Sequence, residues 1–243
     1  MKKKIIAIQT ARANSKSVKK KNLIKINGEE IFLKSLKSAI KCKKINNVVC
    51  STDDKKIISL SKKYKYDIIK RPKNLRGDKA SHLEAIKHAL LASEKKYNTK
   101  FDIIVLLLGN VVGISSKALD QALKKIKDND SVVSVSKFNM FNPLRAYNIN
   151  SKGKLETFKQ LSNIKSKTNA NDKNTMGDIF FCNGNFWILK RSNLFVKSKQ
   201  RPPFPWLGKK IIPFKQKTFF EIDAQWQVSV VKEFSNSFKE EFI

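Results

Sequence analysis

Short apolar runs alternate with amphipathic stretches through most of the chain. Continuous apolar runs are typical of strands buried on both faces of a parallel sheet, and they occur at 5–8 and 103–108. Shorter strand-like segments occur at 48–52, 66–69 and 132–135. Apolar residues at helical spacing occur at 30–40, 53–61, 80–93, 115–127 and 225–234. This alternation predicts an α/β fold in which helices cover both faces of a mainly parallel sheet.

The alternation stops after about residue 137. Residues 139–178 are rich in Asn, Lys and Ser with little periodicity, which indicates an inserted lobe or an excursion from the sheet. The segment 179–189 is strand-like on both sides of a polar centre. Three prolines in 201–206 predict an extended segment, not a helix, which suits a partner contact, a lid or packing over the core.

Composition places the chain among globular proteins. Of its 243 residues, 41% are hydrophobic and 16 are Phe, enough to bury a large core. No apolar run approaches the roughly 18 residues of a membrane span, and the apolar part of the start is too short for a signal peptide. We therefore expect one domain over 1–243, no membrane contact and a cytoplasmic location. The three scattered cysteines and two histidines predict no disulfide framework or zinc site.

The formal net charge of +31 comes from 51 basic and 20 acidic residues. Such a charge can attract nucleic acid. Here, however, the lysines are spread over nearly every polar segment, and Lys and Asn dominate polar positions generally, which indicates a compositional bias. Nucleic acid is not the expected partner, although a basic nucleic-acid binder that keeps this fold stays as an alternative.

Two groups of polar residues suggest a site. The loop after strand 5–8 would lie at the carboxyl end of the sheet, where ligands bind in open α/β folds, and its cations and small polar residues suit a polyphosphate. Glu221 and Asp223 are two apart, so in a strand they share one side and suit Mg²⁺. A plain surface loop and a pair of surface acids, or an N-cap at Asp223, are the alternative interpretations.

Six short motifs, in order and in compatible register, resemble the acylneuraminate cytidylyltransferase (CMP-N-acetylneuraminic acid synthetase) family. They are Ala-Arg-x-x-Ser-Lys…Lys-Asn at 11–22, Ser-Thr-Asp-Asp at 51–54, Arg-Pro…Leu…Asp-x-Ala-Ser at 71–81, Asp-Ser-Val-x-Ser-Val at 130–135, Asn-Gly at 183–184 and Glu-Ile-Asp at 221–223.

The resemblance implies a Rossmann-like nucleotidyltransferase fold of the nucleotide-diphospho-sugar transferase type, with three layers and a small inserted dimerisation lobe. It implies an Mg²⁺-dependent enzyme that transfers CMP from CTP to an acidic, sialic-acid-like nonulosonic acid and releases pyrophosphate. The family usually forms homodimers, and we expect residues 139–170 and 191–207 to provide the dimerisation or lid segments.

The same resemblance implies roles for individual residues. Binding of the triphosphate is implied for Arg12, Ser15, Lys16, Lys21 and Asn22, and contact with the cytidine part for Arg71 and Ser81. Glu221 and Asp223 would hold Mg²⁺. The catalytic group would be Arg12, Lys21 and Asp223, with Asp223 or a bound water taking the proton of the attacking hydroxyl.

Departures from the family pattern concentrate on the sugar half. The family Gly-Gly is Ala13-Asn14, the Gln-Pro-Thr-Ser-Pro-Leu-Arg segment that helps to shape the acceptor pocket is replaced at 108–114, a family acid is Gln227, and a common Ser is His82. Because the acceptor segment differs, a 3-deoxy-octulosonate or a phosphonate stays open as an alternative acceptor.

Overall fold

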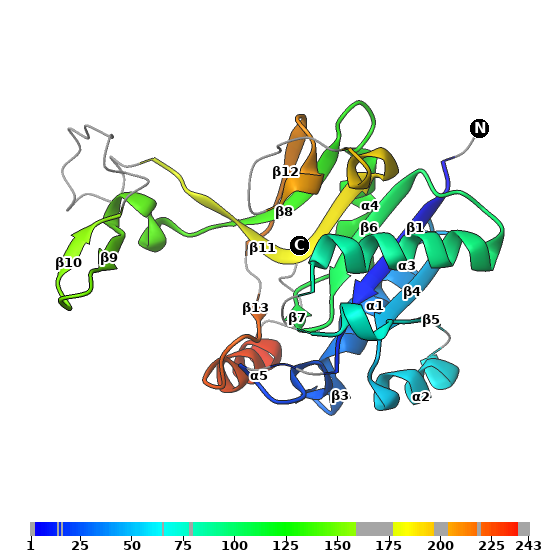
Figure 1. The fold of residues 1–243 in the computed structure, drawn as a ribbon, viewed down its shortest axis with the longest axis horizontal. Coiled ribbons are helices and arrows are strands. Elements are labelled where there is room, and N and C mark those ends of the chain that lie inside the picture. The colour runs from blue at the N-terminus through cyan, green and yellow to red at the C-terminus, as the bar shows by residue number, and fades with distance from the viewer. Residues whose placement is uncertain are drawn as a thin grey trace.

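A seven-stranded sheet in the order β12-β8-β11-β6-β1-β4-β5 forms the centre of the molecule (Figure 1). The computed structural model describes residues 3–13, 15, 17–64, 66–77, 80–158, 177–196, 204–217 and 220–237. The strands of the sheet are β1 (Ile5–Thr10), β4 (Asn47–Thr52), β5 (Asp67–Lys70), β6 (Ile103–Leu108), β8 (Ser131–Lys137), β11 (Phe180–Lys190) and β12 (Ile211–Lys215). The pairs joining β5, β4, β1 and β6 are parallel, whereas β11 runs antiparallel to both β6 and β8.

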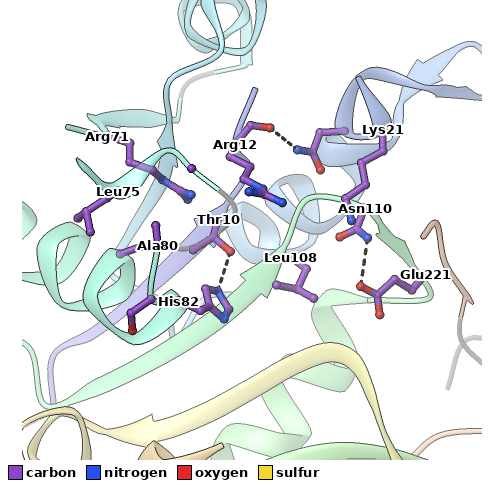
Figure 2. Close-up of a pocket in the computed structure, with 14 residues that line it drawn as sticks. Thr10, Arg12, Lys21, Arg71, Leu75, Ala80, His82, Leu108, Asn110 and Glu221 are labelled. Atoms are coloured by element: carbon purple, nitrogen blue, oxygen red, sulfur yellow. Dashed lines mark hydrogen bonds between the residues drawn. The ribbon is translucent and has the colours of Figure 1, made fainter. Parts of the chain in front are cut away.

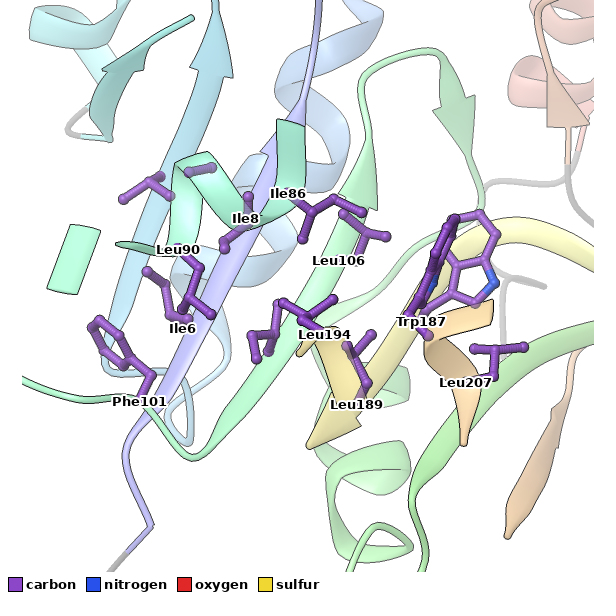
Figure 3. Packing of buried hydrophobic residues seen from close by; sticks show 14 of the residues in the cluster. Ile6, Ile8, Ile86, Leu90, Phe101, Leu106, Trp187, Leu189, Leu194 and Leu207 are labelled. Carbon is purple, nitrogen blue, oxygen red and sulfur yellow. The ribbon is translucent and has the colours of Figure 1, made fainter. Parts of the chain in front are cut away.

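Helices cover the sheet because successive apolar residues of each strand point to opposite faces. On β1, Ile6 and Ile8 pack with Ile86 and Leu90 of the helix that crosses the near face (Figures 1 and 3). Ala7 belongs to the cluster on the other face. The helices are α1 (Ile31–Lys41), α2 (Lys55–Tyr64), α3 (His82–Tyr97), α4 (Ser116–Lys124) and α5 (Gln227–Ser237). This arrangement confirms the predicted three-layer α/β fold.

Small strand pairs complete the fold around the carboxyl ends of the parallel strands. They are β2 (Lys25–Ile26) with β3 (Glu29–Glu30), and β7 (Val111–Val112) with β13 (Phe220–Glu221). The second pair matters for function, because it ties the late acidic segment to the residues that directly follow β6. Among the described residues, no helix combines the length and apolarity that crossing a membrane requires.

The ends of β8 and β11 continue beyond the sheet and carry an arm (Figure 1). At its far end β9 (Tyr147–Ile149) pairs antiparallel with β10 (Leu155–Thr157). The arm lies within the segment predicted to be an inserted lobe. Of the second predicted segment, 197–203 lie outside the described residues. The expectation of an extended chain was wrong for Pro205–Leu207, which forms a 3-10 turn with Pro205 at its start, where no amide hydrogen is needed.

Candidate active site

A cavity of about 330 Å³ lies beyond the carboxyl ends of β1 and β6, beside the first turn of α3 (Figure 2). Its walls come from the loop after β1, the segment after β5, the start of α3, the end of β6 and the late acidic segment. The lining residues are Thr10, Arg12, Lys21, Asn22, Arg71, Leu75, Gly77, Ala80, Ser81, His82, Ala85, Leu108, Asn110 and Glu221. The cavity thus lies where open α/β sheets bind ligands.

The loop after β1 contributes cations to the cavity. Asn22 Nδ2 donates to the carbonyl oxygen of Arg12 at 3.0 Å, which closes the loop on itself (Figure 2). Arg12 and Lys21 line the cavity, and Asn22 is buried beneath them. Ser15, which the structure describes, does not line the cavity. Its Oγ lies 3.4 Å from Ser17 Oγ. Lys16 lies outside the described residues.

The two late acids meet this loop. Lys21 Nζ lies 2.6 Å from Asp223 Oδ1. Asn110, which follows β6, joins the acids: its Nδ2 lies 3.1 Å from Glu221 Oε1, 3.0 Å from the carbonyl oxygen of Ile222 and 3.5 Å from Asp223 Oδ1. Glu221 therefore shares the cavity with Arg12 and Lys21, whereas Asp223 does not line it and is joined to it through its contact with Lys21.

Glu221 is largely buried, and its environment favours the protonated form. Burial, with the nearby charge of Asp223, raises the pKa of Glu221 to about 7. Gly184 packs against this carboxyl group: it has φ +74°, and a Cβ there would lie 3.1 Å from Glu221 Oε2. Gly184 belongs to a bulge in β11 between Cys182 and Trp187. The bulge therefore leaves room for the Glu221 side chain beside Leu108.

Arg71 forms the opposite end of the cavity. Its guanidinium is held by the end of β4, where Nη2 donates to the carbonyl oxygen of Ser51 at 3.1 Å. Burial lowers the pKa of Arg71. Nearby, Ser81 is the N-cap of α3, and its Oγ accepts a hydrogen bond from the amide of Glu84 at 3.4 Å. A buried, pre-positioned guanidinium beside a helix start provides fixed donors for a polar ring or a carbonyl group.

His82, noted in the sequence only as a departure, is part of the cavity wall. Its Nε2 lies 3.2 Å from Thr10 Oγ1, and its ring meets that of Trp206 edge to face with centroids 5.8 Å apart. Burial and the neighbouring charge of Arg71 lower the pKa of His82 to about 4. The imidazole is therefore neutral at physiological pH.

Sequence reasoning missed Asn110, Thr10 and Leu108 as lining residues. The available signal for Asn110 was an amide inside an otherwise apolar stretch, 103–114. Gln227, which replaces a family acid, does not enter the cavity wall. Its Oε1 accepts hydrogen bonds from the amides of Asp223 and Ala224 at 2.6 and 2.7 Å, so it fixes the backbone that carries the acid pair.

The acid pair fits a hydrated divalent cation. In the part of the chain that the structure describes, no cluster of three or more His, Cys, Asp or Glu side chains forms a closed metal site. Mg²⁺ does not need one, because it keeps several waters and binds one or two carboxylates plus phosphate oxygens. Burial, followed by the charge of Asp223, raises the pKa of Glu221, and a bound cation would offset the repulsion between the two carboxylates.

Fold and cavity together define a Rossmann-like α/β protein with its ligand site at the carboxyl ends of the parallel strands. The model of the cytidylyltransferase family matches residues 6–242, and the chain belongs to this family.

Among curated relatives, a CMP-N,N'-diacetyllegionaminic acid synthase of Campylobacter jejuni is 35% identical over 102 residues, which cover 42% of this chain and 43% of that protein. An N-acylneuraminate cytidylyltransferase of Escherichia coli is 34% identical over 90 residues, 37% of this chain and 22% of that protein. The matches thus span less than half of either relative. A solved CMP:2-keto-3-deoxy-manno-octonic acid synthetase complexed with CTP shares the fold, with a TM-score of 0.68, 17% identity, and coverage of 96% of this chain and 98% of that one.

Proposed function

We propose that this protein is a cytidylyltransferase that transfers CMP from CTP to an acidic sugar of the nonulosonic acid type and releases pyrophosphate. The single observation that supports the proposal is the contact between Lys21, which lines the cavity, and Asp223, which brings the late acidic segment against the cationic loop. Family membership gives the nucleotide, and the relatives named above act on diacetyllegionaminic and acylneuraminic acids.

The two ends of the cavity would bind different parts of the nucleotide, the base and ribose at one end and the phosphates at the other. Arg71, with Ala80 and Ser81 beside it, would bind the cytosine and ribose. The N–H groups of its guanidinium can donate hydrogen bonds to the acceptor atoms of these polar rings. Arg12 and Lys21 would hold the β- and γ-phosphates, with Lys16 a further candidate. The α-phosphorus would then lie between these cations and the acid pair.

In the reaction, a hydroxyl oxygen of the sugar attacks the α-phosphorus in line. A bond forms between that oxygen and phosphorus, the bond from phosphorus to the bridging oxygen breaks, and its electrons leave with pyrophosphate. Arg12 and Lys21 stabilise the charge that grows on the leaving group. Asp223, or a water that it binds, takes the proton from the hydroxyl.

Mg²⁺, when held by Glu221 and Asp223, would supply positive charge beside the α-phosphate and orient its oxygens. Asn110 keeps the two carboxyl groups together, and Gln227 fixes their backbone. Because Lys21 also contacts Asp223, the same lysine links the position of the triphosphate to the position of the acids.

A homodimer is part of the proposal. The arm exposes large apolar side chains, at Phe141, Leu144, Tyr147, Ile149, Leu155, Phe180 and Phe181. An isolated two-stranded hairpin is marginally stable in water, and apolar side chains gathered on one projecting element are typical of an interaction surface. A second copy of the chain would cover these apolar side chains and stabilise the hairpin.

The test is an incubation of the purified protein with Mg²⁺, each of the four nucleoside triphosphates and a panel of sugar acids that includes 3-deoxy-octulosonate. Mass spectrometry should detect a CMP adduct only with CTP, together with pyrophosphate in equal amount. No adduct with any acid would reject the proposal. Duplex binding that falls steeply with salt, without a CTP-induced rise in melting temperature, would favour the nucleic-acid alternative.

A further inference from the structure

The end of β4 supports both halves of the nucleotide site. β4 lies between β1, which leads into the cationic loop, and β5, which leads into the segment with Arg71. The carbonyl oxygen of Ser51 accepts hydrogen bonds from the amide of Ala11 and from Arg71 Nη2, each at 3.1 Å. The amide of Arg71 donates to the carbonyl oxygen of Thr52 at 2.9 Å. Ser51 and Thr52 are fully buried, so close packing holds this end of β4 in place.

Asp53, the next residue, holds the cationic loop further along. Its Oδ1 accepts a hydrogen bond from the amide of Ala13 at 3.0 Å. Ala13 directly follows Arg12, which lines the cavity. A hydrogen bond to an ionised acceptor is stronger than one between neutral groups. Asp53 therefore fixes the loop one residue beyond a cation that we assign to the triphosphate.

The carboxyl group of Asp53 has a defined position between the loop and the segment after β5. Its side chain is only 9% exposed. Oδ2 lies 4.0 Å from Arg76 Nε, and the same Nε donates to the carbonyl oxygen of Arg71 at 2.9 Å. Burial lowers the pKa of Arg71, and the nearby charge of Asp53 partly offsets this effect. A carboxylate that is withdrawn from water needs such partners, so these contacts restrict where the side chain can lie.

The groups held by β4 are assigned to different parts of the nucleotide. Arg71 would bind the base and ribose, and Arg12 the phosphates. A ligand that reaches both gains affinity when the protein fixes their separation before binding, because less conformational entropy is lost in the complex. A ligand that fills only the phosphate half gains nothing from the distance to Arg71.

We propose that Asp53 is a positioning residue that holds the cationic loop at a fixed distance from Arg71, so that the site prefers a complete nucleoside triphosphate to a phosphate chain alone. The inference rests on the proposed function, because it concerns the nucleotide of the same reaction. Charge alone predicts a different result. Asp53 is a negative group close to a site for a polyanion, so its removal would strengthen the binding of both ligands to a similar extent.

The experiment measures the dissociation constants of CTP and of inorganic tripolyphosphate by isothermal titration calorimetry, with Mg²⁺ and the full chain. Asp53→Ala removes the acceptor of the Ala13 amide and should reduce the preference for CTP over tripolyphosphate by about tenfold. Asp53→Asn removes the charge but keeps an oxygen that can accept from this amide, so it should keep most of the preference.

Asp54→Ala is the matched control, because it removes the neighbouring carboxylate, which has a different task. Asp54 Oδ1 accepts hydrogen bonds from the amides of Lys56 and Ile57 at 2.8 and 3.2 Å, at the start of α2. Loss of this cap should lower the melting temperature. The preference for CTP over tripolyphosphate should stay as in the native chain.

The outcomes separate this inference from the proposed function. An unchanged preference in Asp53→Ala overturns the positioning role, as does an equal loss in Asp53→Asn or in Asp54→Ala. A native chain that forms a CMP adduct but binds CTP no more tightly than tripolyphosphate also overturns it and leaves the proposed function intact. If the folded native chain gives no CMP adduct with any acid and shows no preference for CTP, both proposals fail.

Discussion

Lys21 and Asp223 are separated by 202 positions in the chain, yet Nζ of one lies 2.6 Å from Oδ1 of the other. The contact joins the loop after the first strand to the segment before the last helix. Asp223 has a side-chain exposure of 54%, so the pair contributes little to folding, at most about 1 kcal/mol. Its position is better explained by ligand binding than by stability.

Arg12→Ala, Lys21→Ala and Asp223→Ala should each lower the rate of pyrophosphate release at least about tenfold, because each removes a charge beside the reacting phosphates. The melting temperature should stay close to that of the native chain. Lys124→Ala is the control, since that lysine pairs with Asp120 on the surface of α4. Near-native turnover in all three site variants would contradict the roles assigned to these residues.

Asn110→Asp should make the protein more dependent on divalent cations. The added carboxylate would lie beside Glu221 and Asp223, so repulsion should lower the melting temperature without metal and Mg²⁺ should raise it more than in the native chain. Differential scanning fluorimetry across a Mg²⁺ titration measures both effects. Asn129→Asp, in the loop before β8, is the matched control. Equal Mg²⁺ responses in all three proteins would argue against a cation at the acid pair.

Gly184→Ala should impair turnover through the Glu221 carboxyl group. Two effects combine at this position: a positive φ, which costs about 1–2 kcal/mol for alanine, and a Cβ 3.1 Å from Glu221 Oε2. Gly153→Ala separates them, because Gly153 has φ +73° and nothing within 4 Å of the added Cβ. We expect urea unfolding to show a loss of stability in both variants, at least as large in Gly184→Ala, and a steady-state assay to show a loss of kcat only in Gly184→Ala.

Most of the sheet could be predicted from the sequence because strands such as Ile103–Leu108 are apolar runs. The edge strand β12 was missed, since its short apolar run, Ile211–Lys215, is interrupted by Pro213. The approach of the cationic loop to the acids could be inferred only through the family resemblance. The role of Asn110 in joining the loop to the acids could not be predicted, because its Nδ2 donates to three oxygens of a segment that lies 111 to 113 positions away in the chain. The hairpin of the arm also escaped prediction, since its strands have three residues each and face solvent, which leaves no periodic pattern.

His82 should make stability depend on pH in the acid range. Its pKa is lowered to about 4 from an ordinary value of 6.5 by burial and by Arg71, so the unfolded chain binds a proton more readily than the folded one. The resulting stability is present above pH 6.5 and is lost as the pH falls through 4. Between these values the native chain should lose up to about 3 kcal/mol more than His82→Ser. Urea unfolding at several pH values tests this, and parallel curves for the two proteins would contradict it.

The arm should hold two copies of the chain together. Ile149 and Leu155 face each other across the β9–β10 pair, with exposures of 73% and 68%. Replacing both with Lys should convert a dimer to a monomer in light scattering after size-exclusion chromatography, because charged side chains cannot be buried without partners. Leu91→Lys, at an exposed site on α3, should leave the dimer unchanged. A native chain that is monomeric, or a double variant that stays dimeric, would show that this hairpin has another partner or none.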